Sequence, residues 1–359
     1  MFLEGIGPYA LEPEQKAGYL AGELARLLEH HARRCPPYAH LVEDWRRHRR
    51  GEAISAEDYP SIPVSLFKEV ELRSTDEPVL QVRSSATTSS AHARIFVDKD
   101  TRKRQTHSAT RVWTDFLGPA RRPYLVFDTE ASARGSGALS ARGAAILSLM
   151  HLASEFHFVC RETDTGIEVD PDALTRALDA IGERPFLAYG FTYILYLSHL
   201  QLASGGEPLR RAHPDSVLLH SGGWKRLESI AVDKPALGRT VAAVWGLDPG
   251  RVIDFYGSVE LVGIPFPDCS RGVKHVPYWS QVVVRRADDL APCGVGETGL
   301  LQLLSLLPLS APNHSVLTED LGELALLDGC ECGRRGRAFR FRGRAPRAEL
   351  RGCSDVARL

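Results

Sequence analysis

The 359-residue sequence lacks a long apolar run, a strong net charge and a targeting segment. No apolar stretch reaches the roughly 20 residues that span a bilayer. The first residues show neither the basic nor the apolar segment of a signal peptide. The 44 Lys and Arg nearly balance the 45 Asp and Glu, which argues against a nucleic-acid binder driven by bulk positive charge. We therefore expect a cytoplasmic protein with no membrane span and no nucleic-acid partner.

Internal repeats, low-complexity segments and an obvious linker are also missing, and there are only seven cysteines. An odd number of cysteines spread over a long chain does not fit the disulfide framework of a small secreted protein. The 43% of apolar residues can build a core without such staples. We predict one large domain over residues 1–343, with a zinc-bearing β subdomain at about 262–343, and a short tail over 344–359.

Periodic patterns and turn signals give a coarse secondary structure. Leucines at helical spacing predict an amphipathic helix over residues 12–35, and Asp170 before Pro171 predicts a helix that continues to about Ile181. Two more helices are expected over residues 141–154 and 233–245. Short β-rich runs predict strands at 79–82, 124–127, 217–220, 252–255, 281–286, 300–304 and 338–341. Because strands alternate with helices first and follow one another later, we predict an α/β fold with more antiparallel structure toward the C-terminus.

Hydroxyl side chains gather directly after the first expected strand. Six of the eight residues from Arg83 to Ser90 are Ser or Thr. Hydroxyl and backbone donors in such a segment can hold a phosphate. The same composition is typical of a solvated loop, and the segment has neither the Gly nor the Lys of a Walker A loop.

Three further motifs lie near expected strand ends. Gly222-Gly223 would let the backbone approach a planar ligand closely. Tyr256-Gly257, with Glu260, could stack on a base and reach a metal-bound phosphate. Asp320, expected in a turn after a strand because Gly322 makes an Asp-x-Gly pattern, could accept both hydroxyls of a ribose. Each motif has a simpler alternative. Gly222-Gly223 is then a tight turn beside a core Trp, Tyr256–Glu260 a strand end with a surface Glu, and Asp320 part of a plain turn.

A set of cysteines and one histidine gives a more specific prediction than the motifs above, from its chemistry alone. Cys269 and His275 form C-x5-H, and Cys330 and Cys332 form C-x-C farther along the chain. Three thiolates and one imidazole make a usual closed tetrahedral zinc site. The spacings are not the commonest ones, and unrelated buried thiols are the alternative. The pattern favours a structural zinc, because four protein ligands leave no open position for catalysis.

The last cysteine, Cys353, lies close to the end of the sequence. Arg347 and Arg351 are its neighbours, and cations lower the pKa of a nearby thiol. The tail therefore offers a candidate reactive thiol, with an exposed cysteine of no function as the alternative.

Taken in order, the motifs resemble those of a known superfamily. Ser84–Ser89, Tyr256-Gly-x-x-Glu260 and Thr318-x-Asp320 resemble the three core motifs of adenylate-forming enzymes, usually SSGTTG, YGxxE and TGD. The sequence is most similar to the LuxE family of acyl-protein synthetases, which is related to the phenylacetate–CoA ligases. Four more segments support this resemblance: Tyr59–Lys68, Gly222–Lys225, Cys269–Pro277 and Glu349–Ser354.

The resemblance implies a fold and a reaction. The fold is the large N-terminal domain of adenylate-forming enzymes, with mixed sheets, flanking helices, a small β subdomain and no C-terminal lid domain. A carboxylic acid, a fatty acid by family, attacks the α-phosphorus of Mg-ATP to give an acyl-adenylate. The acyl group then moves to Cys353 and on to a partner reductase.

The resemblance also implies roles for individual residues. Tyr256 stacks on adenine, Asp320 binds the ribose, Glu260 holds Mg²⁺ and Arg344 contacts the nucleotide. The phosphates are assigned to Ser84, Ser85, Thr87 and Thr88. The sequence departs from the pattern because both glycines of SSGTTG and the Lys that usually follows are missing, and Glu319 replaces the Gly of TGD. Two alternatives therefore stay open: a ligase that delivers its acyl group to coenzyme A, a carrier protein or an amine, and an inactive zinc-stapled binding subunit.

Overall fold

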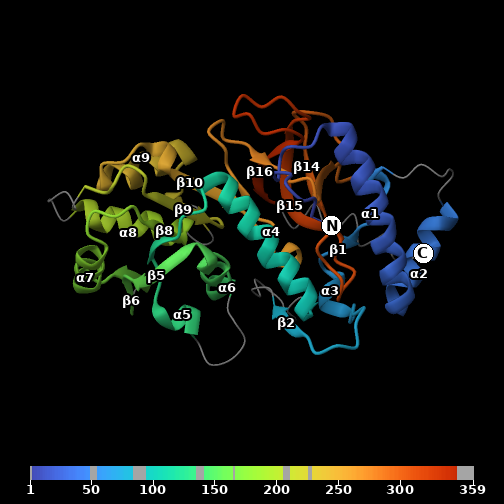
Figure 1. Cartoon of the computed structure of the whole chain (residues 1–359), viewed down its shortest axis with the longest axis horizontal. Coiled ribbons are helices and arrows are strands. Elements are labelled where there is room, and N and C mark those ends of the chain that lie inside the picture. Colours follow the sequence, from blue (N-terminus) through green and yellow to red (C-terminus); the bar gives the residue numbers. More distant parts are fainter. Residues whose placement is uncertain are drawn as a thin grey trace. The chain divides into compact units, whose positions relative to one another are not determined.

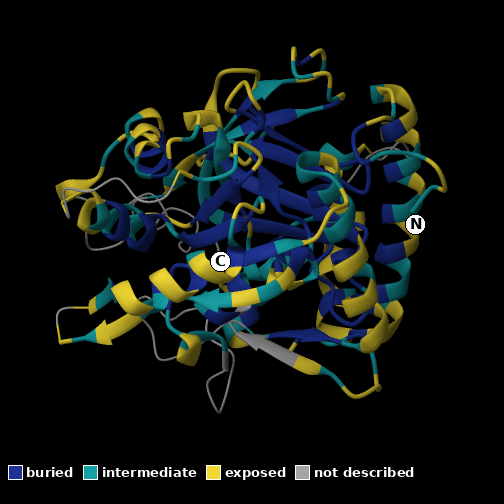
Figure 2. Ribbon diagram, turned by 60° about the vertical axis from the view of Figure 1, so that its left-hand side comes forward, coloured by how far each residue is buried: buried dark blue, intermediate teal, exposed yellow. Residues whose placement is uncertain are grey.

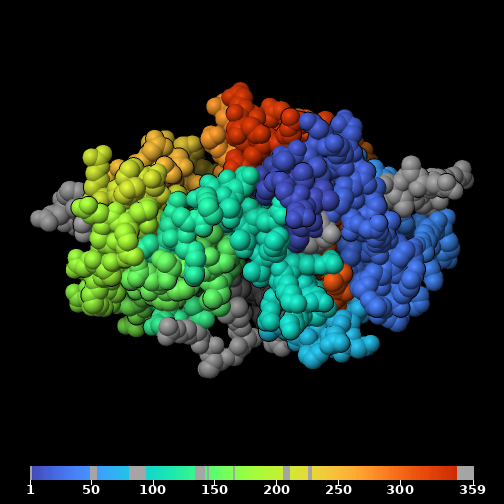
Figure 3. Space-filling view, viewed as in Figure 1, coloured from blue at the N-terminus to red at the C-terminus, as the bar shows by residue number. Residues whose placement is uncertain are grey.

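The computed structural model describes residues 2–48, 55–83, 94–134, 141–164, 166–204, 211–224 and 229–345 (Figure 1). The chain forms two compact units. The terminal unit combines Met1–Asp115 with Gly257–Leu359, and the inserted unit is Phe116–Tyr256. Figure 3 shows that blue N-terminal and red C-terminal atoms share one surface of the terminal unit.

The inserted unit is built on a parallel sheet. Its strands run in the order β10-β9-β8-β4-β5, and every neighbouring pair is parallel. The bounds are β4 Arg122–Val126, β5 Ala153–Phe158, β8 Leu187–Phe191, β9 Val217–Ser221 and β10 Val252–Tyr256. All of β9 is buried, as expected of a strand that is covered on both faces.

Five α-helices and a hairpin accompany this sheet in the described part of the inserted unit. They are α5 Glu130–Arg134, α6 Ala141–Ser148, α7 Pro171–Ile181, α8 Thr192–Ser204, α9 Lys234–Trp245 and the hairpin of β6 Cys160–Thr163 with β7 Gly166–Val169. Asp170 caps α7, since its Oδ1 accepts the N–H groups of Asp172 and Ala173 at 3.0 Å each. A single apolar cluster joins α7, α8 and α9 to the sheet.

The strand order reverses at β4. The next strand, β5, lies on one side of β4, whereas β8, β9 and β10 extend from the other side. In open α/β sheets, ligands bind outside the carboxyl ends of the strands near such a switch point. The carboxyl ends of β4, β8, β9 and β10 meet at one edge because the strands are parallel. This edge is therefore the place in the inserted unit to look for a ligand site.

The terminal unit is built on a largely antiparallel sheet. Its order is β12-β16-β15-β14-β13, and β1 adds in parallel to β15. The bounds are β1 Ile62–Pro63, β12 Lys274–His275, β13 Ser280–Arg285, β14 Thr298–Ser305, β15 Ser315–Leu326 and β16 Ala338–Arg344. Its other elements are α1 Pro13–Arg34, α2 Pro36–His48, α3 Leu66–Glu69, β2 Leu80–Arg83, β3 Arg94–Val97, α4 Lys99–Leu117, which extends into the inserted unit, and β11 Phe266–Pro267. Strands are mostly buried, whereas helices expose one face (Figure 2).

The α/β fold class with a more antiparallel C-terminal part is confirmed. The helices predicted over 12–35, from Asp170 to Ile181 and over 233–245 are α1, α7 and α9. The helix predicted over 141–154 is wrong at its end, because α6 stops at Ser148 and β5 begins at Ala153. Phe156 and Phe158 alternate with polar residues there, and pairing with β4 sets the strand. No helix in the described ranges is long and apolar enough to cross a membrane.

A buried His–Trp pair holds α8 against α9. Trp245 Nε1 donates to His199 Nε2 at 2.8 Å, and His199 Nδ1 donates to the carbonyl oxygen of Leu195 at 2.6 Å. Both rings are fully buried. Burial lowers the pKa of His199 from 6.5 to about 4, so the ring stays neutral at physiological pH.

We expect the inserted unit to lose stability as the pH falls from about 6.5 to about 4. In this range His199 binds a proton in the unfolded chain, whereas the buried ring of the folded protein stays neutral. At about 1.4 kcal/mol per pKa unit, the full loss is on the order of 3 kcal/mol. Urea unfolding followed by tryptophan fluorescence measures it. The loss should be smaller in His199→Gln, where the lowered pKa of the half-buried His151 still contributes, and should be unchanged in His213→Gln, a half-exposed control. Equal losses in wild type and His199→Gln would contradict this account.

Candidate functional site

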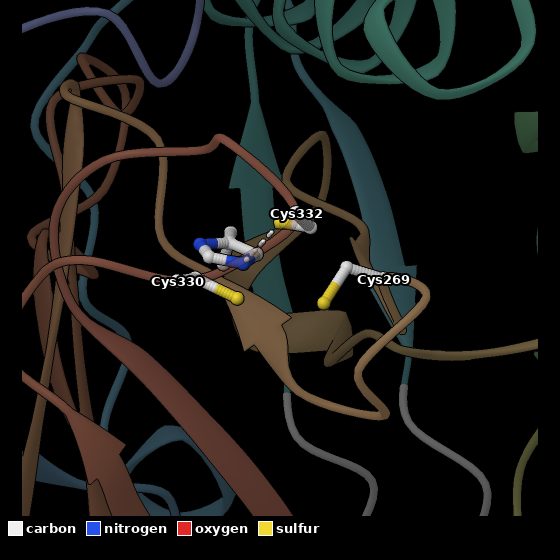
Figure 4. Close-up of side chains that lie close together, drawn as sticks. Cys269, Cys330 and Cys332 are labelled. Carbon is white, nitrogen blue, oxygen red and sulfur yellow. Dashed lines mark hydrogen bonds between the residues drawn. The ribbon is translucent and has the colours of Figure 1, made fainter.

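Three cysteines and one histidine of the terminal unit converge on one point. The ligand atoms of Cys269, His275, Cys330 and Cys332 all lie within 4.8 Å of one another. His275 Nε2 lies 3.2 Å from Cys332 Sγ, and the three sulfur atoms face a common space (Figure 4). A tetrahedral zinc with sulfur bonds of about 2.3 Å holds its ligand atoms roughly 3.8 Å apart. The cluster is therefore close to bonding geometry for one ion.

Two similar turns present the thiols. Gly272 N–H donates to the carbonyl oxygen of Cys269 at 2.8 Å, and Gly333 N–H donates to that of Cys330 at 2.9 Å. Both glycines have positive φ, +66° and +85°, which side chains rarely tolerate. His275 comes from β12, which pairs with β16. The sequence thus uses a glycine three residues after each leading cysteine to bring its thiol to the cluster.

The electrostatics of the cluster suit a cation. Burial lowers the pKa of His275 to about 4, with help from Arg334 and Lys16, so the ring is neutral and offers lone pairs. Its Nδ1 is buried and has no hydrogen-bond partner among the residues that the structure describes. Burial opposes ionisation of Cys332, but the backbone N–H of Arg334 and neighbouring thiols outweigh it and lower the pKa of that thiol, whereas burial raises the pKa of Cys330 to about 11. A neutral imidazole beside an easily ionised thiol is what metal binding requires.

The predicted Gly222-Gly223 turn lies at the carboxyl end of β9. Both glycines are exposed, and Gly222 has a φ of +79°. A Cβ on Gly222 would lie 2.8 Å from the ring of Phe191, whereas a Cβ on Gly223 would meet nothing within 4 Å. Glycine at 222 is therefore required by the turn, and the backbone at 222–223 is open to a ligand.

Thr192, the first residue of α8, is a buried neighbour of this turn that sequence patterns did not single out. Its Oγ1 lies 2.8 Å from the carbonyl oxygen of Gly222 and 2.9 Å from His220 Nδ1. Asp254 Oδ1 lies 3.8 Å from His220 Nδ1, and Lys234 Nζ lies 2.5 Å from Asp254 Oδ2. A lone Thr after an apolar strand carries no signal in the sequence, because only the pairing of β8 with β9 makes it adjacent to Gly222.

The Tyr256-Gly257-x-x-Glu260 motif follows the end of β10. Tyr256 is the last residue of that strand and is 7% exposed, and the boundary between the two units falls just after it. Glu260 lies in a one-turn helix, where Ser258 Oγ donates to its Oε2 at 2.5 Å. The buried Asn313, another residue not predicted, donates through Nδ2 to the Glu260 carbonyl oxygen at 2.7 Å. Glu260 thus keeps a half-buried carboxylate on a fixed backbone.

Asp320 lies within β15, so its predicted place in a turn is wrong. β15 pairs with β14 on one side and β16 on the other, and Asp320 stands opposite Arg344. Arg344 Nε lies 3.8 Å from Asp320 Oδ1. The glycine that suggested a turn, Gly322, instead lies at a shift in the strand register, and such bulges re-aim nearby side chains. The strand pairing brings together two residues that were predicted separately as nucleotide contacts.

Five predicted site residues fall outside the described part of the chain. They are the phosphate-loop candidates Ser84, Ser85, Thr87 and Thr88 and the acceptor Cys353. The described strand β2 ends at Arg83, directly before the first of them.

A family model described as "Acyl-protein synthetase, LuxE" matches residues 4–358. The chain belongs to the LuxE acyl-protein synthetase family. The match covers the Cys/His cluster, the Gly222-Gly223 and Tyr256–Glu260 motifs, Asp320 and residues 344–358 of the C-terminal tail. A search of curated proteins found no match.

Solved structures place this LuxE-family chain in a known fold. An open conformation of 2-hydroxyisobutyryl-CoA ligase, in complex with 2-HIB-AMP and CoA, has a TM-score of 0.68 and 13% identity over 96% of this chain and 74% of that one. The same ligase in the postadenylation state with R3-HIB-AMP has a TM-score of 0.67 and 14% identity over 96% and 72%. The predicted fold of adenylate-forming enzymes is confirmed, and family and fold together support an ATP-dependent acyl-adenylating ligase.

The turn of this LuxE-family protein gives a matched pair of variants. We expect Gly222→Ala to lower the free energy of unfolding by about 1–3 kcal/mol, because alanine at positive φ is strained and its Cβ would strike Phe191. Gly223→Ala should change it by at most about 0.5 kcal/mol. Urea unfolding of the two variants decides the matter, and equal effects would show that the turn does not constrain residue 222.

Proposed function

We propose that the protein is an acyl-protein synthetase that activates a carboxylic acid with ATP and carries the acyl group on its own Cys353. The family match supports this most directly, because it extends to residue 358 and includes Cys353. The pairing of Asp320 with Arg344 across β15 and β16 supports the nucleotide half of the proposal. The acid in this proposal is a fatty acid, as the family resemblance implies.

The first half-reaction joins the acid to AMP. The substrate carboxylate attacks the α-phosphorus of ATP, and pyrophosphate leaves. Asp320 accepts hydrogen bonds from the ribose hydroxyls, and Arg344, held beside it, contacts the nucleotide. Glu260 is the candidate Mg²⁺ ligand, because its carboxylate is an oxygen donor on a fixed backbone. These groups position the reactants and neutralise charge, and these two effects account for most of the catalysis of phosphoryl transfer by proteins.

The remaining nucleotide contacts come from strand ends. Tyr256 stacks on the adenine, and the open backbone of Gly222-Gly223 and Gly257 lies along the nucleotide in this proposal. The phosphates are assigned to Ser84, Ser85, Thr87 and Thr88.

In the second half-reaction the Cys353 thiolate attacks the acyl carbon. The carbon–sulfur bond forms, the bond from the acyl carbon to the AMP oxygen breaks, and AMP leaves with the electron pair. The thiol proton goes to solvent, and Arg347 and Arg351 favour its loss. A partner of the acyl-thioester reductase class then accepts the acyl group. Coenzyme A, a carrier protein or an amine is the alternative acceptor.

We expect ATP-dependent labelling of Cys353 by a radiolabelled fatty acid in the presence of Mg²⁺. The label should be sensitive to hydroxylamine, as a thioester is, and should map to the peptide that holds Cys353. The Cys353→Ser variant should lose the label but keep ATP–pyrophosphate exchange at about the wild-type rate, because adenylation precedes the thiol step. Mass spectrometry of the labelled peptide and exchange of labelled pyrophosphate into ATP measure the two steps.

Three outcomes separate the alternatives. Exchange without label on Cys353, over a panel of fatty and aryl acids, would replace this proposal with a ligase that uses an external acceptor. No exchange with any acid and no nucleotide binding would leave an inactive binding subunit. Label on Cys35 or Cys160 in place of Cys353 would show the thiol assignment to be wrong.

We also propose that Cys269, His275, Cys330 and Cys332 hold a structural Zn²⁺. The geometry supports this, because the four ligand atoms lie within 4.8 Å and the sulfur atoms face one space. The ion would tie the loop after β11 to the loop between β15 and β16, and its binding energy would add to the stability of the terminal unit.

Metal analysis of the purified protein should give about one zinc per chain. Cys332→Ser should lose the metal and lower the melting temperature, whereas Cys293→Ala, which removes another buried thiol of the same unit, should keep it. A metal-free protein with an unchanged melting temperature would refute the structural role.

A further inference from the structure

The geometry points to Thr192 as a positioning residue that sets the Gly222–Gly223 peptide for nucleotide binding. The inference rests on the proposed function, because it concerns the backbone that is assigned to the nucleotide. Thr192 is 5% exposed and stands at the junction of β8 and α8, where it touches the turn after the neighbouring strand β9.

The hydroxyl of Thr192 lies at the centre of a small network. Its Oγ1 lies 2.8 Å from the Gly222 carbonyl oxygen, 3.1 Å from that of Ser221 and 2.9 Å from His220 Nδ1. A hydroxyl has one proton to donate, and the Gly222 carbonyl is the nearest acceptor. His220 Nδ1 must then carry a proton and donate to Thr192 Oγ1. The network therefore fixes both the direction of the hydroxyl and the tautomer of His220.

Two charged residues, Asp254 and Lys234, support this tautomer of His220. His220 is 4% exposed, and Asp254 Oδ1 lies 3.8 Å from its Nδ1. Lys234, at the start of α9, holds the other carboxylate oxygen of Asp254 at 2.5 Å. A carboxylate near Nδ1 favours a proton on that nitrogen. The proton that Thr192 needs from His220 is thus kept in place by residues of β10 and α9.

The bond to Gly222 decides where the next amide points. Every described peptide bond is trans, so the Gly223 N–H points away from the direction of the Gly222 carbonyl oxygen. Thr192 draws that oxygen toward the start of α8, and the Gly223 N–H is therefore directed away from α8. The ring of Phe191 lies 2.8 Å from where a Cβ of residue 222 would stand, so only glycine fits beside it. Two consecutive residues, Phe191 and Thr192, hold one peptide plane.

A donor fixed in this way binds a ligand acceptor without the cost of ordering a free glycine turn. Both glycines are exposed, so the ligand reaches the amide from solvent. The hydroxyl thus acts on nucleotide affinity through the backbone and touches no reacting atom.

The test is the affinity of Mg-ATP, measured by isothermal titration calorimetry on the full chain. Thr192→Val keeps the shape and removes the hydroxyl, and we expect its Kd to rise about tenfold, as loss of one well-placed hydrogen bond does. Thr192→Ser keeps the hydroxyl and should stay within about twofold of wild type. Thr175→Val is the matched control, because Thr175 donates to the Pro171 carbonyl oxygen at 2.8 Å on the exposed surface of α7.

Melting temperature separates positioning from simple stability. A purely structural Thr192 would lower the melting temperature of Thr192→Val and leave the Kd of the folded protein unchanged, which would overturn the inference. Thr192→Ala, which introduces no new atoms, replaces Thr192→Val if the latter does not fold, and the same rise in Kd is expected. Wild-type protein that binds no Mg-ATP would overturn the inference and the nucleotide half of the proposed function together. Wild-type binding that persists unchanged in Thr192→Val would overturn the inference alone.

Discussion

Parallel pairing of β8, β9 and β10 is the constraint on which the inserted unit depends. The register sets Phe191 beside Ser221 and Ser221 beside Phe255, so three strands end at the same level. Residues that are distant in the sequence become neighbours at this edge, as Thr192 and Gly222 do. The turn there needs glycine at positive φ, because a Cβ at residue 222 would strike Phe191, and Thr192 holds its carbonyl oxygen. The backbone hydrogen bonds between these strands thus set the positions of the residues that we assign to nucleotide binding.

Local sequence signals predicted the structure correctly where interactions within one short segment determine it. Asp170 and Pro171 define the start of α7, since the cap and the fixed φ act within one turn of helix. The Cys/His set was also readable, because thiols and imidazoles are rare and their chemistry narrows their use. The glycine at 222 was found as well, although the sequence did not show that the ring of Phe191 requires it.

The errors arose where distant strands decide the local structure. The segment at 149–154 has helical residues, but β5 pairs with β4, and this tertiary contact ends α6 early. Asp320 looked like a turn residue because Gly322 follows it. The chain stays extended there because Asp320 pairs with Arg344 of β16, and Gly322 pairs with Gly299 of β14 and Phe341 of β16. Thr192 and Asn313 were not predicted for the same reason. Each donates a hydrogen bond to the carbonyl oxygen of a residue that is distant in the sequence. Sequence patterns report on neighbours along the chain, and these residues act on neighbours in space.

The division of the chain into a continuous inserted unit and a discontinuous terminal unit has a consequence for synthesis. The inserted unit, Phe116–Tyr256, is complete once the ribosome has translated past Tyr256, and domains generally fold as they emerge. The terminal unit cannot close at that time, because β1 pairs with β15, and Lys16 and Tyr19 of α1 contact Val276 and Tyr278, which are made later. Its N-terminal helices must therefore wait, with their apolar faces uncovered, until β16 has been made. Nascent chains of this protein are thus most exposed to chaperones through α1 and α2, although these helices are made before the inserted unit.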